Sequence, residues 1–247
     1  MKNLNANFKF PKAQIKMKSL LKLYTFILFL PLLVNAQNNN QTDIFIRDSK
    51  LIYQDNFAKE KTGTLPADWT TNGMAILDTT YLAPGKWLKI LKGSGITCNA
   101  KPLALPDSYT IEYEVIPQSD PQKSGWDSYG FTIMSTHKPE DLVYGYSRPG
   151  DAGIKFDFGM YNYYNTYYDD GALPMKGSTS GIKTLPKQEA NHLYKMAFSI
   201  DKTRITVWRD DTKIFDLPEA MDLNYKYNML RFENGTAMIR NFRVATK

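Results

Sequence analysis

The sequence predicts an all-β protein, an antiparallel β-sandwich of the jelly-roll type. Polar and apolar residues alternate over residues 204–208 and 213–217, on either side of an Asp-Asp-Thr turn. The alternation returns over residues 229–232 and 237–244, around a Glu-Asn-Gly-Thr turn, and these two segments are expected to form a second hairpin. Period-two alternation joined by turns of this type is the strongest short-range signal for antiparallel strands.

Earlier in the chain, short strand-like segments are separated by Gly, Pro, Asn and Asp. The expected strands are residues 74–78, 86–91, 109–116, 129–135, 143–146, 153–160 and 192–200. No segment shows a helical period over three turns, although residues 139–142 could form one short turn. Many short strands at regular spacing are typical of a sandwich or barrel, and such folds often exceed about 200 residues as one domain. We therefore expect a single domain over residues 51–247.

The alternation also separates buried from outward-facing positions. In residues 109–116 the apolar positions are Ile111, Tyr113 and Val115. Glu112 and Glu114 are therefore expected on the opposite face of that strand, because successive side chains of a strand point to opposite sides. The same rule sends Asp157 away from the core, since it lies between Phe156 and Phe158. One sheet surface is thus expected to be apolar and the other to carry carboxylates and aromatic side chains.

The first 36 residues have the pattern of an export signal. Lysines come first, and residues 23–34 form an apolar run of the length of a signal core, too short to span a bilayer comfortably. Ala36 is the small residue that a signal peptidase requires. We expect residues 1–36 to be removed and residues 37–50 to form a flexible leader. The mature chain is then expected to lack a transmembrane anchor and to reside in the periplasm, on the cell surface or outside the cell.

Removal of the signal changes the charge balance. Residues 1–36 contain six of the 31 basic residues and no acidic residue, so residues 37–247 carry 25 basic and 25 acidic residues. The basic pI of 9.1 is a property of the signal and does not indicate a nucleic-acid partner. Cys98 is the only cysteine, which excludes a disulfide within the chain and favours a buried small side chain.

The strands and their order resemble the concanavalin A-like, laminin-G-like jelly-roll domain, and in particular the exported module that precedes OmpA-type domains in some envelope proteins. The segments that carry the resemblance are residues 53–57, 63–69, 85–90, 105–113, 204–218 and 239–245. The resemblance implies a jelly-roll fold and recognition of a carbohydrate or a protein more often than catalysis. The chain ends where the OmpA-type domain would begin, so peptidoglycan attachment is not implied.

Glu112 and Glu114 form the first candidate site. Alternate residues of a strand lie about 6–7 Å apart at the backbone, and retaining glycosidases use two carboxyl groups about 5 Å apart. Related jelly rolls use a longer Glu-x-Asp-x-x-Glu pattern, and here Ile116 and Pro117 end the strand instead. The pair could therefore serve a glycoside hydrolase or polysaccharide lyase, but two solvated surface carboxylates are favoured.

Aromatic residues form the second candidate site. Five tyrosines fall within residues 161–168, and Tyr163 is one of them. Aromatic faces with polar tips suit sugar rings, protein surfaces and ordinary packing within a hairpin, and the sequence leaves these three roles open. Trp69 and Trp87 fit core positions of the family. Trp126 and Trp208 are expected to be exposed and could stack on a sugar.

Asp169 and Asp170 are weak candidate ligands for a structural calcium ion, which prefers clustered carboxylate and carbonyl oxygens. Asp210 and Asp211 are better explained as turn residues. The sequence contains no phosphate-binding loop, zinc-ligand spacing or nucleophile elbow, so no other cofactor is expected.

The sequence thus favours an exported, non-catalytic recognition module that binds a carbohydrate, with a glycan or an envelope protein as its partner. The predicted binding residues are Glu112, Glu114, Trp126, Asp157, Tyr163 and Trp208. Carboxylates would accept hydrogen bonds from sugar hydroxyls, and the aromatic rings would stack on the sugar. The alternatives are the hydrolase or lyase that uses Glu112 and Glu114, and a structural envelope protein that binds another protein through the tyrosine-rich segment.

Overall fold

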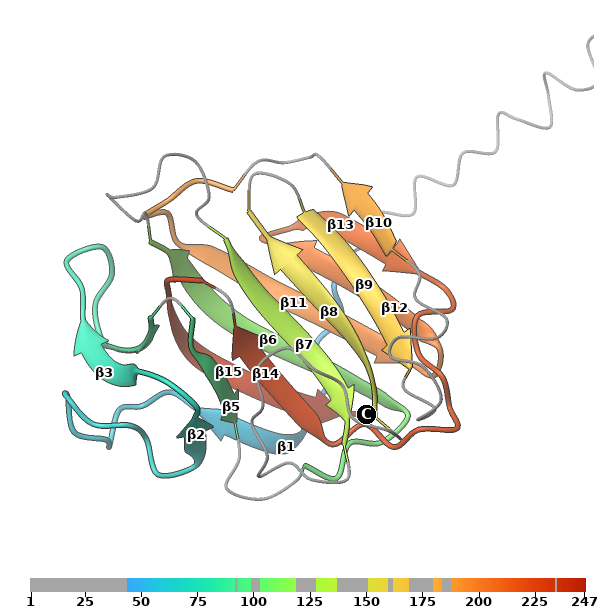
Figure 1. The fold of residues 1–247 in the computed structure, drawn as a ribbon, viewed down its shortest axis with the longest axis horizontal. Coiled ribbons are helices and arrows are strands. Elements are labelled where there is room, and N and C mark those ends of the chain that lie inside the picture. The colour runs from blue at the N-terminus through green and yellow to red at the C-terminus, as the bar shows by residue number, and fades with distance from the viewer. Residues whose placement is uncertain are drawn as a thin grey trace, which may run out of the picture. The chain divides into compact units, whose positions relative to one another are not determined.

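The chain folds into two antiparallel sheets that lie one over the other (Figure 1). The computed structural model describes residues 44–91, 93–98, 103–118, 128–136, 151–159, 162–168, 180–183, 188–233 and 235–247. In these ranges the chain forms strands, turns and loops and no helix, and accordingly no helix there could span a membrane. The predicted signal peptide and residues 37–43 of the predicted leader fall outside the described residues, as do the expected strand at 143–146 and the turn at 139–142.

Sheet A has the strand order β13-β12-β11-β6-β15-β4-β3. Strand β1 belongs to the same sheet and pairs with β15. The strands are β1 (Lys50–Asp55), β3 (Ala75–Thr79), β4 (Lys86–Ile90), β6 (Ser108–Pro117), β11 (Tyr194–Asp201), β12 (Arg204–Arg209), β13 (Thr212–Leu217) and β15 (Ala237–Thr246). The predicted strands at 74–78, 86–91, 109–116 and 192–200 are confirmed here to within two residues at each end.

Sheet B has the order β10-β9-β8-β7-β14-β5-β2. Its strands are β2 (Trp69–Thr71), β5 (Gly95–Cys98), β7 (Tyr129–Ser135), β8 (Ala152–Phe158), β9 (Asn162–Tyr168), β10 (Ser180–Lys183) and β14 (Met229–Glu233). The two sheets make the antiparallel sandwich that the sequence predicts, with β7, β8 and β9 of sheet B over β6, β11 and β12 of sheet A (Figure 1).

One of the two predicted hairpins is confirmed and the other is wrong. Strands β12 and β13 pair directly around Asp210, which adopts the left-handed φ of 53° and accepts a hydrogen bond from the amide of Lys195 at 2.9 Å. Strands β14 and β15, by contrast, belong to different sheets, because β14 pairs with β5 and β7 while β15 pairs with β1, β4 and β6. The chain crosses between the sheets at Gly235, where any Cβ would overlap the carbonyl of Ser128.

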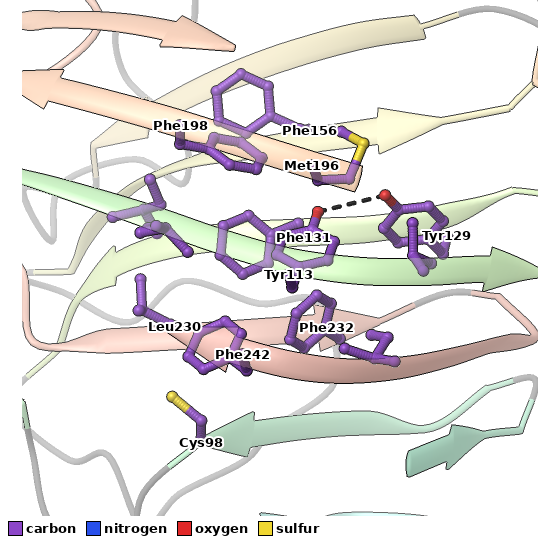
Figure 2. Close-up of a cluster of buried hydrophobic side chains, with 14 of the residues drawn as sticks. Cys98, Tyr113, Tyr129, Phe131, Phe156, Met196, Phe198, Leu230, Phe232 and Phe242 are labelled. Atoms are coloured by element: carbon purple, nitrogen blue, oxygen red, sulfur yellow. Dashed lines mark hydrogen bonds between the residues drawn. The ribbon is translucent and has the colours of Figure 1, made fainter. Parts of the chain in front are cut away.

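The space between the sheets is filled mainly by aromatic rings (Figure 2). Tyr113 of sheet A meets Phe232 of sheet B edge to face, with ring centroids 5.0 Å apart. The hydroxyl of Tyr113 is 3.3 Å from that of Tyr129, so the two phenols satisfy each other inside the core. Trp69 and Cys98 are also buried, as predicted, and burial raises the pKa of the Cys98 thiol.

Residues 44–49 lie against the outer face of sheet A. The ring of Phe45 packs on Trp208 with centroids 5.4 Å apart. Arg47 contacts Glu112, and Arg243 donates a hydrogen bond to the carbonyl of Asp48 at 2.6 Å. Part of sheet A is therefore covered by the segment that precedes β1.

Candidate functional site

The predicted binding residues are divided between the two outer faces of the sandwich. Glu112 and Trp208 lie on strands of sheet A, whereas Asp157 and Tyr163 lie on adjacent strands of sheet B. All of them point away from the core, so the two groups lie on opposite sides of the protein and cannot contact the same small ligand. Trp126 lies outside the described residues.

The sheet A carboxylates are neither a free catalytic pair nor solvated charges. Glu112 accepts a hydrogen bond from Arg243 at 2.8 Å and a second from Arg47 at 2.8 Å, and Glu114 accepts one from Arg240 at 2.6 Å. Their side chains are only 13% and 19% exposed. These ion pairs connect β6 to β15 and to the preceding segment, which is a structural role.

The expectation that Trp208 is exposed is wrong. Its exposed fraction is 6%, because the Phe45 ring lies against it. A register irregularity between Val207 and Trp208 also interrupts the pairing with β13 at this point. A ring covered in this way is not available to stack on a sugar.

The outer face of sheet B carries a continuous set of polar side chains. The strand register places Arg231 beside Thr132, and Thr132 beside Lys155. The neighbouring row follows Glu233, Gly130, Asp157 and Tyr163 across four adjacent strands. We call this set the polar face; it consists of Thr132, Lys155, Asp157, Tyr163, Arg231 and Glu233.

Lys155 joins the two carboxylates of the polar face. Its ammonium lies 3.3 Å from Oε1 of Glu233 and 3.6 Å from Oδ1 of Asp157. Thr132 donates a hydrogen bond to Oε1 of Glu233 at 3.0 Å, and Nε of Arg231 lies 3.5 Å from Oε2. Charged groups of both signs therefore hold one another in place on the outer face of sheet B, which fixes the orientation of each.

Asp157 has one carboxylate oxygen without a hydrogen-bond donor among the described residues. The residue is 6% exposed, and the oxygen is Oδ2. Burial raises the pKa of Asp157 and Glu233 adds to the rise, whereas Lys155 and a hydrogen bond from Tyr163 oppose it. A buried carboxylate oxygen without a donor is costly, so a donor supplied by a ligand would be favourable there.

Tyr163 borders this carboxylate from the next strand. It is 38% exposed, and its pKa is raised first by partial burial and then by the neighbouring Asp157. It is the aromatic residue of the row that contains Asp157, and its partial exposure leaves the ring accessible to a ligand. The predicted pair of Asp157 and Tyr163 is thus brought together by the register of β8 and β9.

Glycines make room for the long charged side chains. A Cβ at Gly130 would lie 3.1 Å from Cγ of Glu233 and 3.3 Å from Oδ1 of Asp157. A Cβ at Gly95 would overlap the guanidinium of Arg231. Two glycines on strands beside β14 therefore let Arg231 and Glu233 lie close to the sheet backbone.

Sequence reasoning missed Arg231 and Glu233, although a signal for them exists. They alternate with the apolar residues Leu230 and Phe232, which are fully buried. A strand over residues 229–232 was predicted, with Glu233 in the turn that follows it. The charged positions were not related to Lys155 and Asp157, because a local pattern does not show that β14 lies two strands from β8.

No metal site is evident in the described part of the chain, where no three His, Cys, Asp or Glu side chains converge. The weak calcium candidates Asp169 and Asp170 lie outside the described residues. Asp210 has the positive φ and the side-chain hydrogen bond of a turn residue, as predicted.

No protein-family model matches the chain, and no curated protein is similar to it in sequence. Solved structures are similar in fold. The carbohydrate recognition domain of Emp47p has a TM-score of 0.57 at 14% identity, over 81% of this chain and 97% of that one. The exoplasmic/lumenal domain of VIP36, bound to Ca²⁺ and Man3GlcNAc, has a TM-score of 0.52 at 12% identity, over 73% of this chain and 85% of that one.

A bacterial structure is also similar. Domain 4 of AbnA, an extracellular arabinanase of Geobacillus stearothermophilus, in complex with arabinotriose, has a TM-score of 0.51 at 14% identity, over 80% of this chain and 93% of that one. At these identities the likeness shows the fold alone. The predicted concanavalin A-like sandwich is confirmed, and the resemblance to the module that precedes OmpA-type domains stays a prediction.

Proposed function

We propose that this protein is a carbohydrate-binding module whose site is the polar face of sheet B. The observation that carries the proposal is Asp157, a buried carboxylate with an oxygen that lacks a donor, within an ordered set of donors and acceptors. The fold supports it, because three structures of the same fold are a carbohydrate recognition domain and two oligosaccharide complexes.

Each member of the polar face has a role that suits a sugar. Lys155, whose side chain is 23% exposed, donates to hydroxyl and ring oxygens, and the nearly buried Asp157, Glu233 and Arg231 contribute hydrogen bonds at their exposed edges. Tyr163 offers an aromatic surface on which the C–H face of a sugar ring can pack. Two cations and two anions leave this face close to neutral, which favours a sugar whose hydroxyls form most of its contacts.

We further propose that the module is exported, does not catalyse a reaction and acts in the cell envelope or outside the cell. The lysine-rich start and the apolar run before Ala36 support export. The test is N-terminal sequencing of the protein recovered from a secreting host, where a start at Gln37 is expected. Recovery of the uncleaved chain in the cytosolic fraction would contradict it.

A glycan array probed with and without a calcium chelator tests the binding function. We expect selective binding that Asp157→Asn weakens about 10- to 100-fold, because the loss of a hydrogen bond to a charged group costs about 1.5–3 kcal/mol. Glu112→Gln is the matched control, since it changes a carboxylate on the opposite face. Loss of binding with Glu112→Gln but not with Asp157→Asn would move the site to sheet A, and a blank array from folded protein would reject the proposal.

A hydrolase or lyase remains the second candidate, now with a different pair of carboxylates. Asp157 and Glu233 both lie within 3.6 Å of the Lys155 ammonium, whereas Glu112 and Glu114 are occupied by arginines. The raised pKa of Asp157 suits a general acid. Turnover of a bound glycan that disappears in both Asp157→Asn and Glu233→Gln would favour this candidate, and binding without turnover would count against it.

A further inference from the structure

A separate cavity lies at one end of the sandwich. Its volume is about 540 Å³, within the range of small-molecule sites. Its walls are mostly apolar and include Leu103, Leu105, Met221, Leu223, Tyr225 and Tyr227. None of the lining residues belongs to the polar face of sheet B, so this cavity is independent of the proposed glycan site.

Backbone hydrogen bonds hold the walls in place. The amide of Leu103 bonds to the carbonyl of Asn228 at 3.1 Å, which connects the segment before β6 to the segment before β14. The amide of Lys202 bonds to the carbonyl of Asp107 at 2.8 Å, and the amide of Met221 bonds to Thr203 at 3.1 Å. The cavity is thus formed without a ligand, and a ligand would not have to order it.

Tyr109 supplies an unsatisfied polar group to the wall. The residue is 2% exposed, and its hydroxyl has no hydrogen-bond partner among the described residues. The hydroxyl of the neighbouring Tyr227 instead accepts a hydrogen bond from the amide of Asp222 at 3.2 Å. Buried hydroxyls are nearly always paired, so a ligand that reaches the Tyr109 hydroxyl from the cavity would gain a hydrogen bond there.

The charged residues that line the cavity are two lysines and one aspartate. Lys202 and Lys226 are exposed. Asp107 is the single carboxylate among the lining residues. The rim therefore favours an anion, although solvent exposure limits the strength of the attraction.

We propose that this cavity binds a small amphipathic carboxylate that carries an oxygen at its apolar end. The carboxylate lies at the rim beside Lys202 and Lys226, and the hydrocarbon chain packs against the Leu and Met side chains. The oxygen at the far end accepts a hydrogen bond from the Tyr109 hydroxyl. A hydroxy or keto acid of medium chain length has this chemistry.

Calorimetric titration with three probes tests the proposal: 8-hydroxyoctanoate, octanoate and 1-octanol. We expect one site, with octanoate binding at least about tenfold tighter than octanol and 8-hydroxyoctanoate about fivefold tighter than octanoate, as one buried hydrogen bond allows. Tyr109→Phe should remove the second difference and leave octanoate binding unchanged. If no acid binds, or if octanol binds as well as octanoate, the proposal is wrong.

Two pairs of variants locate the binding. Leu223→Trp places a large ring at a lining residue that is 53% exposed, and it should weaken the binding of octanoate at least about tenfold. Tyr81→Trp, at a 92% exposed position that does not line the cavity, is its control and should have no effect. Lys202→Glu with Lys226→Glu should weaken the acids alone, whereas Lys59→Glu with Lys61→Glu should not. Unchanged octanoate binding by Leu223→Trp would refute the location of the site in this cavity. As a control, each variant should bind glycan as the unmodified protein does.

Discussion

Replacement of Arg231 by Met tests whether the polar face is a coupled charge network. Arg231 is 5% exposed and Glu233 is 7% exposed, so removal of the cation leaves a buried carboxylate with fewer partners. Breaking a buried ion pair in this way costs about 3–5 kcal/mol. Glu233 retains Lys155 at 3.3 Å and Thr132 at 3.0 Å, so we expect the lower end of that range, about 3 kcal/mol.

Urea unfolding of the purified protein measures this cost. For a chain of this size the slope is near the upper end of about 1–3 kcal/mol per molar, so the midpoint should fall by roughly 1 M. Addition of Glu233→Gln to the Arg231→Met protein removes the buried carboxylate that has lost its cation. It should recover more than about half of the lost unfolding free energy. The difference from additivity is the coupling between the two side chains.

A surface ion pair provides the matched control. Arg204 is bonded to Asp216 at 2.7 Å, but its side chain is 54% exposed. Arg204→Met should therefore cost less than about 1 kcal/mol. The reasoning is refuted if Arg231→Met costs no more than Arg204→Met, or if the effects of Arg231→Met and Glu233→Gln simply add.

Three further outcomes are expected. Tyr113→Phe leaves the buried hydroxyl of Tyr129 without its partner, which should cost about 1–2 kcal/mol of unfolding free energy and lower the Tm by roughly 2–8 °C. An unchanged Tm would contradict the role of this hydrogen bond. Phe45→Ala uncovers Trp208 and should shift its fluorescence to longer wavelength, measured as the difference from a Trp208→Phe protein; no shift would show that Phe45 does not shield the ring. Burial raises the pKa of Asp157 in the folded protein, so the folded state binds its proton more tightly than the unfolded chain does, and the cost of burying the charged form grows as pH rises through the folded pKa. The stability advantage of Asp157→Asn over the natural protein should therefore increase from about pH 4 to about pH 7, and a constant difference would contradict this.

Much of the fold could be predicted from local pattern. Alternation at Ile111, Tyr113 and Val115 correctly predicted the buried side of β6, and the same rule placed Asp157 on an outward face. Alternation did not reveal which sheet a strand joins, because that depends on partners far away in sequence. The predicted hairpin of β14 and β15 failed for this reason: two strands that follow one another with a short turn are consistent both with pairing and with a crossing between sheets.

The candidate site was predicted only in part for the same physical reason. Asp157 and Tyr163 were identified as outward polar and aromatic residues, but Glu112 has the same local pattern and lies on the other sheet. Arg231 and Glu233 can be assigned to the candidate site only when β14 is known to pair with β7. Trp208 was expected to be exposed because its strand pattern gives no sign of Phe45, which lies more than 160 residues earlier.

The position of β15 determines when the protein can fold. This strand lies between β6 and β4 in sheet A and also pairs with β1, where Thr246 is opposite Lys50. During synthesis sheet A therefore lacks this interior strand until residues 237–246 have been made. Contacts between segments so distant in sequence form slowly, typically over about milliseconds to seconds. We therefore expect the sandwich to assemble as one cooperative event once β15 has been made, and the earlier strands to have unpaired edges until then.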